Sequence, residues 1–126
     1  MKNLYSKKES DEYFFIEGCH ILELFNIKAD NKVSIARARV EPGKETKLHR
    51  LEGIEERYLI QSGTGLATIG DHPAFTVKKN DVVTIAANIP QKIRNTGNDD
   101  LIFLAICTPR FTPEAYYACE TDCENS

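Results

Sequence analysis

Short stretches of alternating apolar and polar residues run along this chain, and turn-forming residues separate them. An alternation with a period of two is typical of half-buried strands, because successive side chains of a strand point to opposite faces. Gly, Pro, Asn and Asp between the stretches favour tight turns. The pattern predicts seven strands: Cys19 to Asn26, Val33 to Val40, Glu56 to Ser62, Leu66 to Ile69, Val82 to Ile85, Gln91 to Asn95 and Leu101 to Cys107.

Seven short strands at this spacing favour an all-β sandwich or barrel. The pattern changes after residue 107, because Pro109 has no N–H with which to continue a central strand. A threonine, a proline and a glutamate at positions 112 to 114 then resemble a helix start. We expect a short helix from Pro113 to about Cys119. The segment Pro109-Arg110-Phe111 either folds over the barrel mouth or packs on a neighbouring subunit.

Length and charge narrow the class of protein. The chain has 126 residues, which suits a single domain with one core. Its 16 Lys and Arg and 19 Asp and Glu give a net charge of −3, with both signs interspersed, so the basic stripe expected of a nucleic-acid-binding protein is missing. No apolar run near the N-terminus is long enough for a signal peptide or a membrane span. We therefore expect a cytoplasmic protein without a nucleic-acid or membrane partner.

One stretch in the first half of the chain carries a specific spacing of glycine, histidine and glutamate. Gly43 is followed after five residues by His49, and Glu56 and Gly63 come later in the same stretch. This arrangement resembles the first motif of the cupin family, which has Gly, five residues, His-x-His, three or four residues, Glu, six residues and Gly. Four of the five positions match, and Leu51 stands where the family has its second His.

The counterpart of the second cupin motif spans Asn80 to Asn95 and matches less well. The family has Gly, five residues, Pro-x-Gly, two residues, His, three residues and Asn; here only Asn95 agrees, and Gln91 replaces the His. The flanking strand pattern and the distance between the motifs fit the family, so the resemblance covers about residues 33–107. It implies an all-β cupin fold, a double-stranded β-helix or jelly-roll barrel, in one domain over residues 1–126 with a tail at 108–126.

Members of the family usually hold a divalent transition metal with three His and one Glu inside the barrel. Carried over by position, this chain offers His49, Leu51, Glu56 and Gln91. Leucine cannot ligate, and a neutral amide oxygen is a poor donor toward metals that imidazole favours. The resemblance therefore implies at most a reduced site of His49, Glu56 and Gln91 for an ion such as Zn, Mn, Fe or Ni.

Strand parity gives an independent expectation for the barrel interior. If Glu56 points inward, Tyr58 and Ile60 do too, because side chains two apart lie on one face of a strand. An apolar cavity with a few polar groups results, as in a small-ligand pocket. On the strand Leu101 to Cys107, either Phe103, Ala105 and Cys107 or the alternate residues face inward, and both options stay open.

Two arginines, Arg37 and Arg39, share one face of a predicted strand. Pointed inward, they would bind a carboxylate or phosphate by forked hydrogen bonds. Pointed outward, they would form a solvated or subunit-contacting face. The remaining histidines, His20 and His72, are interpreted as structural or exposed. The ligand-binding candidates are Gln91, Tyr58 and Arg39.

His49 and Glu56 are the candidate catalytic residues. An imidazole exchanges protons near neutral pH, and a carboxylate in an apolar barrel has to be paired, protonated or metal-bound. The resemblance implies a small-molecule-binding cupin, and the loss of two His favours acid–base chemistry of the isomerase, epimerase, cyclase or lyase type on a sugar- or oxo-acid-like metabolite. Two alternatives stay open: a divalent-metal-dependent enzyme with the reduced site, and a non-catalytic metabolite-binding module.

The resemblance also implies an assembly. Cupins commonly pair as homodimers through strand exchange or sheet packing. The segment Tyr13 to Asn26 is apolar enough to lie against a second copy of the chain.

Overall fold

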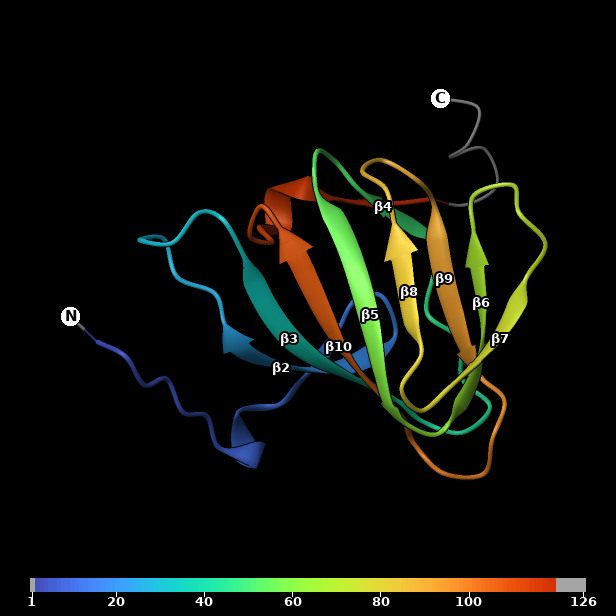
Figure 1. Cartoon of the computed structure of the whole chain (residues 1–126). Helices are drawn as coiled ribbons and strands as arrows, with labels where there is room; N and C mark the ends of the chain where they lie inside the picture. The colour runs from blue at the N-terminus through green and yellow to red at the C-terminus, as the bar shows by residue number, and fades with distance from the viewer. Residues whose placement is uncertain (1, 120–126) are drawn as a thin grey trace.

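The structure, a computed structural model, describes residues 2–119. Within this range eleven strands form two antiparallel sheets that face each other (Figure 1). The six-stranded sheet has the order β1-β2-β3-β10-β5-β8, and the five-stranded sheet has the order β11-β4-β9-β6-β7. The strands are β1 (Tyr13–Phe15), β2 (Cys19–Phe25), β3 (Ser34–Val40), β4 (His49–Leu51), β5 (Glu55–Ser62), β6 (Thr64–Ile69), β7 (Phe75–Lys78), β8 (Val82–Ile85), β9 (Gln91–Asn95), β10 (Leu101–Thr108) and β11 (Tyr116–Ala118).

The all-β prediction is confirmed, and all seven predicted strands are present with ends that differ by at most two residues. The sequence pattern did not predict β1, β4, β7 and β11. Each of these strands has three or four residues. So short a segment shows too few alternations to be distinguished from a loop.

The predicted helix from Pro113 to about Cys119 is not formed. A 3₁₀ turn, η2 (Pro113–Ala115), begins at the proline as the helix signal indicated, and β11 follows it directly. β11 pairs antiparallel with β4, with Tyr116 opposite Leu51. Pairing with β4 therefore overrides the local helix-start signal. A second 3₁₀ turn, η1, spans Glu9–Asp11, and no helix in the described range is long and apolar enough to cross a membrane.

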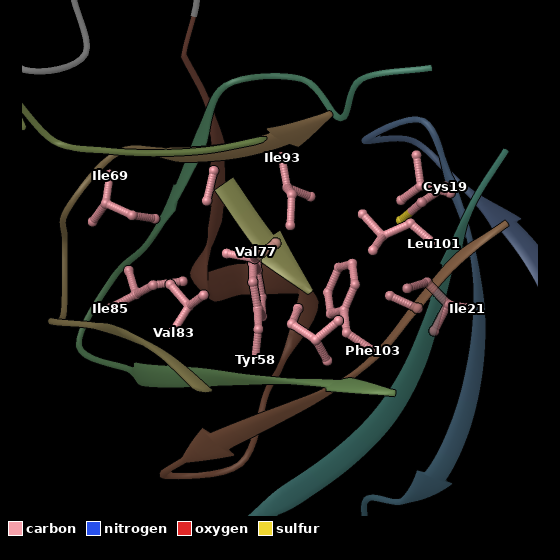
Figure 2. Close-up of a cluster of buried hydrophobic side chains, with 14 residues drawn as sticks. Cys19, Ile21, Tyr58, Ile69, Val77, Val83, Ile85, Ile93, Leu101 and Phe103 are labelled. Carbon is pink, nitrogen blue, oxygen red and sulfur yellow. The ribbon is translucent and has the colours of Figure 1, made fainter. Parts of the chain in front are cut away.

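The hydrophobic core lies between the sheets, where the inward faces of the strands meet (Figure 2). Ile60 from β5 and Ile93 from β9 represent the two sheets and are 1% and 0% exposed. On β10, Phe103 and Cys107 are buried, so the odd-numbered residues of this strand face inward. This settles the choice that the sequence had left open. The ring of Phe103 packs against Tyr58 with a centroid distance of 4.3 Å.

The outer face of β3 binds the N-terminal segment, drawn in dark blue in Figure 1. Arg37 Nη2 donates to Glu9 Oε1 at 2.8 Å, and Arg39 Nη2 donates to Glu12 Oε1 at 2.7 Å. Arg39 also donates to Asp100 at 3.1 Å. Of the two orientations that the sequence allowed for these arginines, the structure shows the outward one.

Candidate active site

A cavity lies against the inner face of the six-stranded sheet. The space in it that is open to the centre of a water-sized molecule has a volume of about 50 Å³. Three of the lining residues, Tyr58, Phe103 and Ile21, are seen in Figure 2 pointing into the space between the sheets. The lining residues are Tyr13, Phe15, Glu17, Cys19, Ile21, Glu23, Ser34, Ala36, Ala38, His49, Leu51, Glu56, Tyr58, Phe103, Ala105, Cys107 and Phe111.

His49 is the first residue of β4 and is 2% exposed. Its Nδ1 lies 2.7 Å from the backbone oxygen of Lys47. A carbonyl oxygen only accepts, so Nδ1 carries the proton and Nε2 of the neutral ring keeps its lone pair. The ring of Tyr116 stacks on the imidazole at a centroid distance of 5.1 Å. Burial lowers the pKa of His49, against the opposing effects of the Lys47 hydrogen bond and the charge of Glu56.

Glu56 lies on β5, is 7% exposed and lines the same cavity as His49. Its Oε2 lies 3.7 Å from the thiol sulfur of Cys107, and its buried Oε1 has no hydrogen-bond partner among residues 2–119. Burial, and next the charge of Glu17, raise the pKa of Glu56 to about 7. A carboxyl with this pKa exchanges its proton near neutrality, as a general acid or base must.

Glu17 is a third polar group of the cavity, and the sequence analysis missed it. It lies in the turn between β1 and β2, where the backbone oxygen of Glu17 accepts from Lys47 N at 2.7 Å. Its Oε2 is 3.6 Å from His49 Nε2, its side chain is 15% exposed, and burial raises its pKa to about 7. The only signal in the sequence is one acidic residue before Gly18 between two apolar runs, which marks a hairpin turn without showing where the carboxyl points.

Tyr58 and Gln91 are bonded to each other. The Tyr58 hydroxyl donates to Oε1 of Gln91, and the two side chains are 3% and 1% exposed. Tyr58 lines the cavity, whereas Gln91 lies behind it in β9, opposite His49 of β4. Burial raises the pKa of Tyr58 well above its ordinary value, so its phenol keeps its proton.

The structure does not bring Arg39 to the cavity, although the sequence analysis included it among the ligand-binding candidates. Its neighbour Ala38 lines the cavity, so the alternation along β3 directs Arg39 to the opposite face. His20 is also outside the lining and contacts Glu41 at 2.8 Å. His72 is exposed in a turn. The sequence had assigned both histidines to structural or exposed positions.

The segment after β10 closes one side of the cavity from within the chain. Phe111 lines the cavity, and its backbone N–H donates to Ser34 Oγ at 2.8 Å. Asn26 fixes the segment from both sides, because it donates to the Phe111 carbonyl and accepts from Arg110 Nη1 at 2.8 Å. The segment Pro109-Arg110-Phe111 thus lies against the cavity of its own chain through Phe111.

Comparison with known proteins decides the family. A family model described as a cupin domain matches residues 36–107, which is more than half of the chain. The chain belongs to the cupin family. An uncharacterized protein of Methanocaldococcus jannaschii is 39% identical to it over 104 residues, covering 81% of this cupin and 82% of the relative. An oxalate-binding protein of Thermotoga maritima is 37% identical over 92 residues, covering 72% of this cupin and 74% of the relative.

Solved structures agree with the fold. Streptomyces Pac13, described as a nucleoside dehydratase, superposes with a TM-score of 0.76 at 16% identity, covering 95% of this cupin and 92% of Pac13. A Pac13 variant with uridine gives a TM-score of 0.79 at 17% identity, with the same coverage. A predicted oxalate decarboxylase of Thermotoga maritima gives 0.67 at 32% identity, covering 72% of this cupin and 80% of that chain. At 16–17% identity the likeness to Pac13 shows the fold alone.

The residues at the metal positions of the family do not form a suitable donor set in this cupin. Leu51 has no donor atom, and the oxygen of Gln91 already accepts the Tyr58 hydroxyl. Only His49 and Glu56 keep typical ligand atoms. In the part of the chain that the structure describes, no group of three or more His, Cys, Asp or Glu could hold a metal ion.

Proposed function

We propose that this cupin is an enzyme that binds a small carbonyl- or hydroxyl-bearing metabolite and transfers protons with His49 and Glu56. The reaction class is that of an isomerase, epimerase, cyclase or lyase. The observation that carries the proposal is that these two groups, from strands of different sheets, line one buried cavity. Acid–base catalysis needs such a pair on one substrate.

The two groups differ in the form that they take near neutral pH. His49 presents the lone pair of Nε2, because its Nδ1–H donates to the backbone carbonyl of Lys47. Burial also lowers the pKa of the ring, so the neutral form is favoured. Glu56, with a pKa of about 7, carries a proton in a large fraction of molecules. Nε2 then takes a proton from a C–H or O–H of the substrate, and the Glu56 carboxyl gives one to a substrate oxygen. Protons balance within this scheme, and no electron transfer is needed.

A product screen tests the proposal. Purified protein is incubated with sugars, sugar phosphates and oxo acids, and conversion is followed by mass spectrometry and NMR. We expect turnover by the wild type and a loss of about 100-fold or more in Glu56→Gln and His49→Gln. Glu52→Gln, which changes an exposed carboxylate outside the cavity, is the matched control. Turnover that survives both active-site changes contradicts the assignment.

Metal analysis separates this proposal from the reduced metal site of His49, Glu56 and Gln91. Protein purified without chelator is examined by inductively coupled plasma mass spectrometry. We expect less than stoichiometric divalent metal in the wild type. Stoichiometric metal that disappears in His49→Gln would favour the metal-dependent alternative.

Non-catalytic binding of a small carboxylate is the second candidate function. It is supported by the 37% identity to a protein named for oxalate binding. Calorimetry with oxalate tests it directly. Oxalate binding combined with no product from any screened compound would favour this candidate over the enzyme.

We further propose that the protein is a homodimer in the cytoplasm. The β1 region supports the dimer, because Tyr13, Phe14 and Ile16 are 45%, 64% and 64% exposed, and apolar patches of this kind mark interfaces. Light scattering should give twice the chain mass of 14.2 kDa. Phe14→Lys should reduce the mass to that of one chain.

A further inference from the structure

The wall of the cavity is acidic. Glu17, Glu23 and Glu56 contribute to it from the β1–β2 turn, β2 and β5, and none of its described lining residues is Lys or Arg. Arg37 and Arg39, which belong to the same sheet, are paired with glutamates on its outer face. A ligand in this cavity therefore meets three carboxyls and one imidazole among mostly apolar side chains, and no Lys or Arg of the described residues lies beside them.

Glu56 contributes to the cavity a carboxyl oxygen that residues 2–119 leave without a hydrogen bond. The residue is more than nine-tenths buried, and its Oε1 has no partner among the described residues. A buried polar atom without a partner is costly, so native structures usually satisfy it with protein, water or ligand. A ligand N–H or O–H in the cavity would satisfy this oxygen, whereas a ligand carboxylate would face the ionised form of Glu56 with like charge.

Glu17 holds its position through backbone contacts. The Lys47 N–H donates to the Glu17 carbonyl, and the Lys47 carbonyl accepts from His49 Nδ1, both at 2.7 Å. The peptide groups of one residue thus fix the acid and the imidazole relative to each other. Gly18 completes the turn with a φ of +101°, a region open to glycine at little cost. A change of the Glu17 side chain to Gln keeps all these backbone contacts.

We propose that this cavity selects a small ligand that presents N–H or O–H donors and carries no net negative charge, and that Glu17 is a residue that sets this specificity. The inference rests on the proposed function, because it concerns the same cavity. It adds the ligand class and a residue that the catalytic scheme does not use. The volume of about 50 Å³ restricts the ligand to a small molecule.

Three probes of nearly equal shape separate charge from size: oxalate, oxamate and oxamide carry charges of −2, −1 and 0. Calorimetry measures their affinities for the wild type, Glu17→Gln and Glu52→Gln. We expect the wild type to bind oxamide about tenfold or more tightly than oxalate, because like charges in an enclosed site repel. Glu17→Gln should lower the ratio of oxamide affinity to oxalate affinity about tenfold, because it removes one carboxylate. The affinity for oxamate should lie between those for oxamide and oxalate. Glu52→Gln changes the net charge equally outside the cavity and should leave the ratio unchanged.

Three results would overturn the inference: oxalate binding as tightly as oxamide, an unchanged ratio in Glu17→Gln, or no heat from any of the probes. Should Glu17→Gln not fold, Glu23→Gln tests the same acidic wall, because a Gln at this position can still accept from Asn26, as Glu23 Oε2 does at 2.9 Å. The assay measures binding without turnover. A wrong ligand class therefore shows in these ratios, whereas a wrong catalytic assignment shows in the turnover of Glu56→Gln.

Discussion

Replacing Glu56 by Gln should change how the stability of this cupin depends on pH. In the unfolded chain this carboxyl titrates near 4.5, and in the folded protein burial moves its pKa to about 7. Between these values the unfolded state has released the proton and the folded state retains it. The free energy of unfolding therefore falls as pH rises through this window. The loss of stability caused by ionising Glu56 is complete above about pH 7 and absent below about pH 4.5.

The size of the effect follows from the difference between the two pKa values. A tenfold change in proton affinity corresponds to about 1.4 kcal/mol, so the ionised carboxyl destabilises the fold by about 3 kcal/mol at alkaline pH. Glu56→Gln keeps the shape and removes the titration. Relative to the wild type, the variant should become more stable by about 3 kcal/mol between about pH 5 and about pH 8. The lowered pKa of His49 makes the free energy of unfolding rise with pH below the ordinary pKa of histidine, which is the opposite direction. This contribution is present in both the wild type and Glu56→Gln.

Urea unfolding followed by far-UV circular dichroism measures this difference, since the chain has no tryptophan for fluorescence. Glu52→Gln, at an exposed position, serves as the control and should follow the wild type. In Glu17→Gln the free energy of unfolding should fall less steeply with pH than in the wild type. Glu17 itself has a pKa of about 7, and its charge raises the pKa of Glu56. Parallel pH profiles for wild type and Glu56→Gln would refute the buried, proton-holding carboxyl.

Three further changes test the structure around the site. Tyr58→Phe removes the donor to a buried oxygen of Gln91 and should cost about 1–3 kcal/mol in urea unfolding; no loss would show that the bond is not formed. Gly63→Ala should destabilise by more than Gly53→Ala: both glycines have positive φ, but only at Gly63 would a Cβ meet a backbone oxygen at 2.7 Å, and equal thermal shifts would contradict this contact. Leu51→His together with Gln91→His restores the usual ligand set of the family, and metal analysis should find more divalent metal than in the wild type; equal metal in both proteins would contradict the fit argument.

The parts of the fold that the sequence predicted are those with a long local pattern. β5 shows its alternation over eight residues, so the sequence indicated that Glu56 and Tyr58 share a face, and both line the cavity. For β3 the same alternation placed Arg39 and Ala38 on opposite faces of the strand, but it did not indicate which of the two faces inward. That choice depends on the other strands of the sheet and on Glu12, which pairs with Arg39 from the N-terminal segment.

The parts that the sequence did not predict depend on contacts between distant segments. Glu17 reaches His49 because the β1–β2 turn docks on the backbone of Lys47. β11 forms because β4 has an edge with which it can pair. Neither contact leaves a periodic mark in the sequence. The sequence alone therefore does not predict such short strands or the direction of a turn side chain, because tertiary contacts determine both.

Leu51 connects the lost metal position with the chemistry of the cavity. It is 3% exposed and forms a small apolar cluster with Ile54 and Cys107, against which Phe111 and Tyr116 pack. The leucine that replaces a ligand thus supports the ring that stacks on His49 and the segment that closes the cavity. Burial raises the pKa values of Glu17 and Glu56, and no Lys or Arg among the described lining residues opposes this effect. Under the proposed function, the replacement that weakens the metal donor set thus leaves His49 and Glu56 to act as proton-transfer groups.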